Sequence, residues 1–303
     1  MSNLILIFVC LILGIVLKRA KIVPENFHSS LNAFVINISL SAFSLYYISK
    51  IELNSSVIFP ALVPWIGIFF AIIFFYILGK IFSWKHSVIG ALIMCAGFGN
   101  TSFIGIPVIQ ALYGEEGLKT VMLVDQPGFI ALSTVGILVA NFYSGSKDSL
   151  LKHLTKIIKF PPFIAFIIAL ILNAFSIEIP KEIDETLLKL GSTTVPLALV
   201  SVGSQMKWKK IEKQEGFYLF LGLTFKLILY PLLILILYKY LFLQNGKIID
   251  ISVLESAMAP MITAAIIAEA HHLDSKICNL MVAIGIPLSF VTLAIWHYIL
   301  QVL

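Results

Sequence analysis

Polar and helix-breaking residues interrupt an apolar stretch, residues 87–111, that is long enough to cross a membrane. The interruption supplies an amide, two hydroxyls, two glycines and a proline: Asn100, Thr101, Ser102, Gly99, Gly105 and Pro107. Backbone N–H and C=O groups inside a bilayer need partners within the protein, so such a break is tolerated only where it is buried or lines a watery cavity. These residues are therefore candidates for binding a solute.

A matching interruption lies far along the chain. Residues 257–264 read AMAPMITA, and Pro260 is followed by Met261, Ile262 and Thr263. Proline removes a backbone donor and clashes with the carbonyl four residues earlier, so both stretches should be broken near the middle of the membrane. The N-terminal ends of broken helices carry partial positive charge and free N–H groups, which suits a carboxylate. The alternative is that these residues only bend membrane helices.

Three ionisable residues lie inside apolar stretches: Asp125, Lys226 and Glu255. Charged groups at such depth are costly and often functional. A carboxylate there can bind and release a proton, and Lys226 can pair with either acid. The alternative places both acids in water near the outer interface and extends Lys226 to the headgroups. We favour that alternative for Glu255 and leave the other two residues open.

Neither a metal site nor an enzyme active site is expected. His271 and His272 are adjacent, so on a helix they point about 100° apart and cannot clamp a metal as an i, i+4 pair would. We expect both at the surface, with no cofactor. The sequence also lacks the H-E-x-x-H and paired-aspartate motifs of intramembrane proteases and prenyl-transfer enzymes.

The elements that must position these residues are membrane spans. The chain has 303 residues, of which 59% are hydrophobic and 12% charged, and its mean hydropathy is +1.00. Charged clusters divide it into ten apolar spans, at 3–17, 31–48, 57–79, 87–111, 118–141, 160–177, 186–206, 216–238, 250–268 and 277–302. A spanning helix needs about 20 residues. We therefore expect one all-α membrane domain over residues 1–303, with the lipid bilayer as its environment.

Basic residues set the expected orientation. Most of the 21 Lys and Arg residues fall on the cytoplasmic side if the N-terminus lies outside. The positive-inside rule then predicts a multi-pass protein of the cell membrane with both termini on the non-cytoplasmic side. Because topology accounts for the net charge of +5, this charge does not indicate a nucleic-acid partner.

The two halves of the chain resemble each other weakly, and Pro24 of the first half aligns with Pro180 of the second. Each half holds five spans, and because five is odd, the halves enter the membrane in opposite orientations. We expect repeat one over 1–143, a cytoplasmic loop over 144–159 and repeat two over 160–303. Such inverted repeats are typical of secondary transporters, and the broken spans four and nine hold corresponding positions in the two halves.

Three segments are similar to the auxin efflux carrier family. They begin at Asn100 (NTSFIGIPVIQALYG), Val195 (VPLALVSVGSQM) and Ala259 (APMITAAIIAEAHHLDS). The resemblance implies ten helices in a 5+5 inverted repeat, related to the bile acid:sodium symporters, with spans four and nine crossing at their breaks. It also implies a scaffold of spans 1, 2, 6 and 7, which can pair two copies as a homodimer, and a transport domain of spans 3–5 and 8–10.

The resemblance also implies roles for single residues. Asn100 matches the asparagine that faces substrate, and Pro107 and Pro260 match the crossover prolines. Pro196 keeps the proline of the seventh span, whereas Ser41 stands where many relatives have a proline in the second. The expected substrate site therefore combines both breaks with the second span: Ser41, Asn100, Thr101, Ser102, Pro260, Met261, Ile262 and Thr263.

The expected function is secondary transport of a small organic anion, a carboxylate of auxin-like or dicarboxylate type, by elevator-type alternating access. The coupling ion stays open between a proton, sodium and none, although the few polar side chains at the crossing favour a proton or uniport. Two alternatives remain, which are a sodium-coupled organic anion symporter and a membrane receptor that binds its ligand without moving it.

Overall fold

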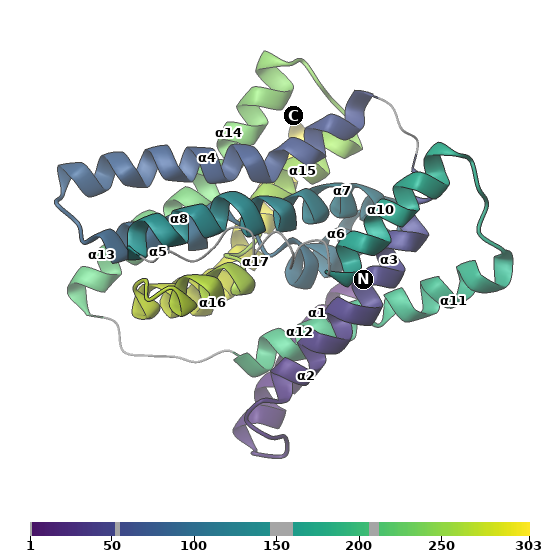
Figure 1. The fold of residues 1–303 in the computed structure, drawn as a ribbon, viewed down its shortest axis with the longest axis horizontal. Coiled ribbons are helices and arrows are strands. Elements are labelled where there is room, and N and C mark those ends of the chain that lie inside the picture. The colour runs from purple at the N-terminus through teal and green to yellow at the C-terminus, as the bar shows by residue number, and fades with distance from the viewer. Residues whose placement is uncertain (1, 52–54, 146–159, 206–211) are drawn as a thin grey trace. The chain divides into compact units, whose positions relative to one another are not determined.

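The computed structural model describes residues 2–51, 55–145, 160–205 and 212–303 (Figure 1). Every regular element in these ranges is a helix, and the only β-type pairing among them is one isolated antiparallel bridge between Gly99 and Pro260. The predicted cytoplasmic loop at 144–159 lies outside the described residues except for its first two positions.

Several helical segments of the described chain are suited to a bilayer by length and composition. Six are long and apolar enough to cross it: Phe27–Ile48, Ser55–Ile81, Glu116–Ser144, Lys181–Gln205, Gln214–Leu241 and Ser275–Val302. Three further apolar helices are shorter: His86–Gly97, Thr101–Tyr113 and Pro161–Ala174. The predicted class, an all-helical membrane protein, is confirmed, whereas the ten-span inverted repeat stays a prediction.

The chain divides into two compact units. Unit 1 comprises residues 1–55, 102–126 and 156–207. Its helices are α1 (Ser2–Arg19), α2 (Phe27–Phe34), η1 (Val35–Ser39), α3 (Leu40–Ile48), α6 (Ile106–Tyr113), α10 (Pro161–Ala174), α11 (Lys181–Ser192) and α12 (Thr194–Gln205), with most of η3 (Thr101–Gly105) and of α7 (Glu116–Ala131).

Small residues allow the helices of unit 1 to pack closely. A Cβ added to Gly14 of α1 would lie 2.2 Å from the Val200 carbonyl oxygen of α12. A Cβ on Gly203 of α12 would lie 2.2 Å from the Leu11 carbonyl oxygen of α1. The two backbones are therefore in contact, as is common where membrane helices meet through small residues. Elsewhere in the unit, the Asn173 amide donates to the carbonyl oxygens of Ser49 and Ile51, each at 2.8 Å.

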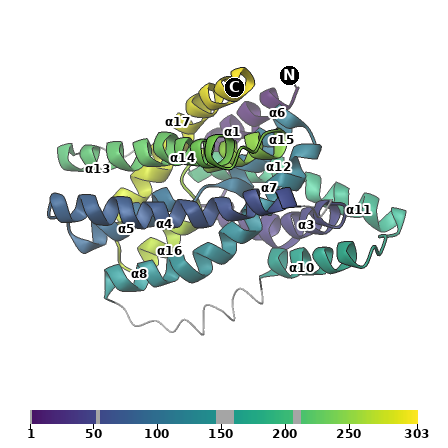
Figure 2. The ribbon, with the colours of Figure 1, turned by 90° about the horizontal axis from the view of Figure 1, so that it is seen from above.

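Unit 2 comprises residues 56–101, 127–155 and 208–303. Its helices are α4 (Ile58–Ile81), α5 (His86–Gly97), η4 (Leu132–Gly136), α8 (Ile137–Ser144), α13 (Lys213–Thr224), η5 (Phe225–Leu229), α14 (Tyr230–Leu235), η6 (Ile236–Leu241), α15 (Lys247–Ser256), α16 (Ile262–Ala270) and α17 (Ser275–Val302), preceded by the short η2 (Ser55–Val57). Helix α5 packs against both α4 and α8 (Figures 1 and 2).

Aromatic side chains fill the core of unit 2 around η5. The Phe225 ring lies 4.9 to 5.1 Å, between centroids, from the rings of Phe70, Phe74 and Phe75 on α4. The Trp296 indole of α17 donates to the Leu227 carbonyl at 2.8 Å, which pairs a backbone oxygen within the π-helical turn η5. Such π-helical turns often occur at functional sites, and η5 carries Lys226.

Candidate functional site

Both predicted helix breaks are present. Each is a short non-helical segment that lies in unit 2. Helix α5 ends at Gly97 and is followed by Phe98 in extended conformation, with φ −115° and ψ 137°. Helix α15 ends at Ser256, and α16 begins at Ile262 after an extended Met261 with φ −72° and ψ 123°. The predicted interruptions therefore exist as breaks of the helix rather than as bends.

The proline of the first stretch does not sit in its break. Pro107 is the second residue of α6, and it lies inside the continuous helical segment Thr101–Tyr113 because the π-helical turn η3 runs directly into α6. The prediction placed Pro107 at the crossing of the two broken helices. Its position is wrong, because Phe98, Gly99 and Asn100 form the first break. Pro260, by contrast, lies within the second break.

The two broken segments pair with each other through their backbones. The Asn100 N–H donates to the Ala259 carbonyl at 2.8 Å, and the Met261 N–H donates to the Phe98 carbonyl at 3.2 Å. This antiparallel pairing is centred on Gly99 and Pro260. An unpaired backbone group would cost several kcal/mol in hydrocarbon, so this pairing explains how two interruptions persist inside a membrane protein.

A buried ammonium group lies directly against this pairing. Lys226 is fully buried, and its Nζ donates to the Ser256 carbonyl at 2.9 Å. Ser256 is the last residue of α15, so the positive charge lies at the negative end of that helix. The same Nζ lies 4.6 Å from the centroid of the Tyr230 ring, a cation–π contact. The interpretation that Lys226 extends to the headgroups is therefore wrong.

Glu255 lies in the interior of unit 2 beside Lys226. Its side chain is 1% exposed, and its carboxylate interacts electrostatically with the Lys226 ammonium. The favoured interpretation of Glu255 as a hydrated residue near the outer interface is wrong. Tyr230 continues the cluster, because its hydroxyl donates to the Val63 carbonyl of α4 at 2.6 Å. The cluster thus connects α4, η5, α14 and α15 around Lys226 and Glu255.

Two glycines permit the close approach of these segments, and the sequence-based prediction did not assign them this role. A Cβ on Gly99 would lie 3.1 Å from Lys226 Nζ and 3.3 Å from the Glu255 carbonyl oxygen. A Cβ on Gly285 of α17 would lie 2.5 Å from Cδ of the Pro260 ring. The sequence places Gly99 in a predicted break, but it does not identify the neighbour of either glycine.

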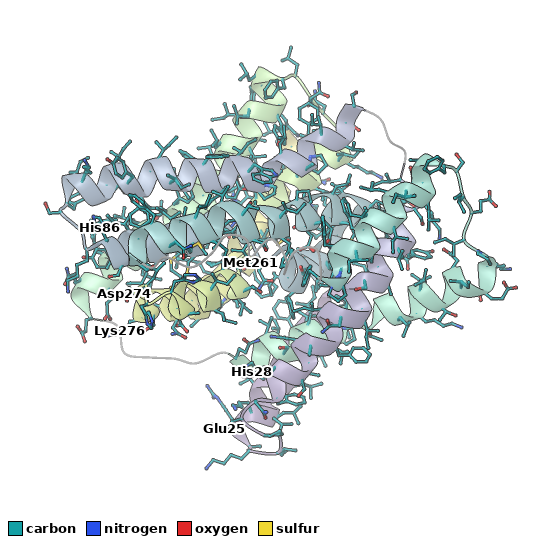
Figure 3. The ribbon with its side chains drawn as sticks, in the orientation of Figure 1. Glu25, His28, His86, Met261, Asp274 and Lys276 are labelled. Carbon is teal, nitrogen blue, oxygen red and sulfur yellow. The ribbon has the colours of Figure 1, made fainter. Side chains whose placement is uncertain are left out.

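Several predicted substrate residues surround the pairing within unit 2. Asn100 and Thr101 are buried, at 3% and 7% exposure. Met261, Ile262 and Thr263 at the start of α16 are half-buried (Figure 3 labels Met261). The first-turn N–H groups of a helix have no partner within it, so the start of α16 can receive an anionic group.

The remaining predicted residues belong to unit 1. The Ser102 hydroxyl donates to Asp125 Oδ1, and the Gln126 amide donates to Asp125 Oδ2 at 3.2 Å. Asp125 is 6% exposed, so the interpretation of Asp125 as a hydrated interfacial residue is wrong. Ser41 is half-buried on α3, and Pro196 lies in the first turn of α12.

The histidine pair differs from its prediction at one position. His271 is buried, and its Nδ1 lies 2.8 Å from the Ile267 carbonyl oxygen, whereas His272 is exposed. The predicted surface position is thus wrong for His271 and right for His272. The chain turns sharply after α16, with φ of 58° at His272, which points the two side chains in different directions.

Interrupted helices that pair at a buried polar crossing are characteristic of secondary transporters. The family described as membrane transport protein matches residues 1–297. The chain therefore belongs to this family, which is the auxin efflux carrier family. Its function is membrane transport rather than enzymatic catalysis.

Individual relatives match over nearly the whole chain. An uncharacterized transporter of Methanocaldococcus jannaschii is 30% identical over 309 residues, 99% of this chain and 98% of that protein. The uncharacterized transporter YfdV of Escherichia coli K12 is 26% identical over 315 residues, 98% and 96% of the two chains. An uncharacterized transporter of Methanothermobacter thermautotrophicus is 25% identical over 299 residues, covering 97% and 96%.

Proposed function

We propose that this transporter moves a small organic anion of carboxylate type across the cell membrane by elevator-type alternating access. The observation that carries the proposal is the crossing in unit 2, where two broken helices pair and a lysine ammonium lies beside them. Broken helices near the midplane are the usual substrate sites of secondary transporters. A helix that only anchors a protein has no use for such a break.

The substrate class follows from the donors around the crossing. The Asn100 amide, the Thr101 hydroxyl and the first turn of α16 offer N–H and O–H groups, and the helix N-terminus adds partial positive charge. These groups suit an anionic oxygen. Met261 and Ile262 add apolar surface, which favours an organic anion over an inorganic one. Ser41 and Ser102 of unit 1 are proposed as further contacts along the transport path.

The charge cluster supports a particular mode of coupling. The Lys226 ammonium already binds a carbonyl oxygen at the crossing, where a sodium-coupled carrier needs oxygen ligands for its ion. We therefore favour a proton or uniport over sodium. Glu255 beside Lys226, and Asp125 with its Ser102 partner, are the carboxylates proposed to carry a proton.

The moving and static parts are also a proposal. We assign spans 3–5 and 8–10 to the transport domain. The crossing and spans three, eight, nine and ten belong to unit 2, whereas spans four and five are divided between the two units. Spans one, two, six and seven belong to unit 1, which we assign to the static scaffold and to the contact in a homodimer. The inverted 5+5 repeat and both termini outside complete the proposed architecture.

A binding experiment on purified protein tests the substrate class. We expect one or more members of a panel of small mono- and dicarboxylates to raise the melting temperature, because a ligand that binds only the folded state stabilises it. Asn100→Ala should weaken this binding at least about tenfold, the effect of losing one hydrogen bond to a charged group. Asn37→Ala is the matched control, since the Asn37 amide is exposed and bonds only its own helix at Ala33.

Two results would contradict the proposal. One is a panel in which neutral analogues stabilise the protein as well as the carboxylates do. The other is an Asn100→Ala variant that binds the carboxylate as tightly as the wild type. A ligand that binds but never accumulates in vesicles would instead favour the receptor hypothesis, and sodium-dependent accumulation would favour the symporter.

A further inference from the structure

A groove on the apolar surface of unit 2 is separate from the helix crossing. It has a volume of about 740 Å³ and lies between α4 and the η4–α8 segment. Its walls include Ile72, Tyr76, Val135, Leu138, Phe142 and Tyr143, and no residue of the crossing lines it. The volume falls in the range of about 300–1,000 Å³ that is usual for ligand sites.

Apolar and aromatic side chains make up most of the groove lining, with Asn141 among them. On α4, Ile72 and Tyr76 lie one turn apart on the same face, and on η4–α8, Val135, Leu138 and Phe142 repeat at helical spacing. The rim is open, because Tyr76 is 45%, Leu138 47% and Phe142 70% exposed. An extended hydrocarbon chain lying along the two helices would cover these side chains.

One end of the groove is basic. Lys80 lies one turn after Tyr76 on the same face of α4, and its Nζ lies 5.1 Å from the centroid of the Tyr76 ring. His86 contacts the other wall, where its ring lies edge-on to Tyr143 with centroids 5.8 Å apart (Figure 3). Lys85 is exposed directly before His86. Lys80 and His86 therefore lie where the two walls end, and Lys85 directly precedes His86 in the chain.

This positive charge is available to a ligand. None of the eight described residues that line the groove is acidic. Within the described chain, Lys80 and Lys85 take part in no ion pair, in contrast to Lys276, which pairs with Glu212 and Glu215. The groove thus combines a long apolar wall with a cationic end that lacks a counter-charge among the described residues.

We propose that this groove binds an anionic phospholipid. The acyl chain lies between α4 and η4–α8, and the headgroup phosphate contacts Lys80, Lys85 and His86. The expected orientation places this end at the cytoplasmic leaflet, where anionic lipids attract clustered lysines. A small soluble anion would use only the basic end and would leave the apolar walls uncovered.

Lipid binding to the purified full-length protein tests the proposal by native mass spectrometry. Phosphatidylglycerol should bind more tightly than phosphatidylcholine of the same chain length. Lys80→Gln should weaken phosphatidylglycerol binding about fivefold, the contribution of one lysine near an anionic surface, and should weaken phosphatidylcholine binding less, because the choline charge offsets that of the phosphate. Lys189→Gln, an exposed lysine on α11 outside the groove, is the matched control and should change neither.

A second pair of variants tests the apolar walls. Leu138→Trp fills the groove and should reduce the binding of both lipids, whereas Ile295→Trp, at an exposed position of α17, should not. Phe142→Ala should weaken both lipids without risk to folding, because that side chain is 70% exposed. The proposal is overturned if Leu138→Trp and Phe142→Ala leave phosphatidylglycerol binding intact, if phosphatidylcholine binds equally well, or if inorganic phosphate alone competes the lipid away.

Discussion

At the scale of single residues, the pairing of the two broken helices depends on the close contacts around the Lys226 ammonium. Its Nζ bonds the Ser256 carbonyl, faces the Tyr230 ring and would lie 3.1 Å from a Cβ on Gly99. A buried charge is stable only when such partners replace its water. The electrostatic partner Glu255 therefore matters as much as the lysine itself.

Gly99→Ala should disturb this site from the backbone side. The added methyl group meets Lys226 Nζ and the Glu255 carbonyl, and the second of these is backbone that cannot move away. We expect a loss of about 1–3 kcal/mol in the free energy of unfolding, the usual cost of overpacking, together with reduced transport. Gly128→Ala is the control, because its methyl group would lie 3.6 Å from Pro64, an ordinary contact. Equal melting temperatures for the two variants would contradict this account.

The Lys226 and Glu255 charges should show coupled effects on stability. Lys226→Met keeps much of the stem but leaves the Glu255 carboxylate buried beside no ammonium, which should cost about 3–5 kcal/mol. Adding Glu255→Gln should restore part of this loss, since it removes the uncompensated charge. Thermal unfolding of the two single variants and the double variant measures the coupling. Additive losses would show that the two groups do not stabilise each other.

At the scale of helices, the sequence predicted more of the architecture than of the contacts. Apolar length and the charged links predicted the helices, and glycine, proline and polar residues predicted where two of them break. The exact break at Phe98–Asn100 was not predictable, because its extended backbone is held by Ala259 and Met261 from a distant part of the chain. Pro107 carried the stronger local signal, yet the helical segment Thr101–Tyr113 continues through it.

The burial of the charged residues could not be predicted either, because it depends on partners far away in the sequence. Five buried α15 residues between Ile249 and Leu254, both apolar and polar, precede Glu255, and nothing local shows that Lys226 of η5 lies beside it. The same holds for Ser102 and Asp125, whose hydrogen bond joins two elements of unit 1. The sequence identified all four residues as candidates, but it could not decide between hydrated and buried positions.

Close helix packing in unit 1 gives a prediction at this scale. Gly203→Ala places a methyl group 2.2 Å from the Leu11 carbonyl oxygen, so α1 and α12 must separate along their contact. We expect a larger drop in melting temperature than for Gly128→Ala, because backbone on both sides has to shift rather than a flexible side chain. Thermal unfolding in detergent measures it. A Gly203→Ala protein as stable as wild type would show that the two helices are not held this closely.

At the scale of the whole molecule, the protein is a transporter with a buried lysine ammonium at the pairing of its broken helices. Membrane transport follows from the family, whereas the anion, the elevator motion and the coupling are proposals. Transport in proteoliposomes should therefore proceed at the same rate with and without a sodium gradient. Under uniport, the outward flux of an anion should increase when the interior is made negative, since each charge is worth about 2.3 kcal/mol per 100 mV, whereas cotransport of one proton per carboxylate charge should make the flux independent of the potential. A strict sodium requirement would contradict the role given to Lys226.

The most direct test of the central claim is counterflow in proteoliposomes. Vesicles loaded with the carboxylate that stabilises the purified protein are placed in a trace of the same radiolabelled compound. We predict transient accumulation of label with the wild-type protein and with Asn37→Ala, and little with Asn100→Ala at the same protein density. Stable binding of the carboxylate by the wild type without any accumulation of label would contradict the claim that the crossing of broken helices carries an organic anion across the membrane.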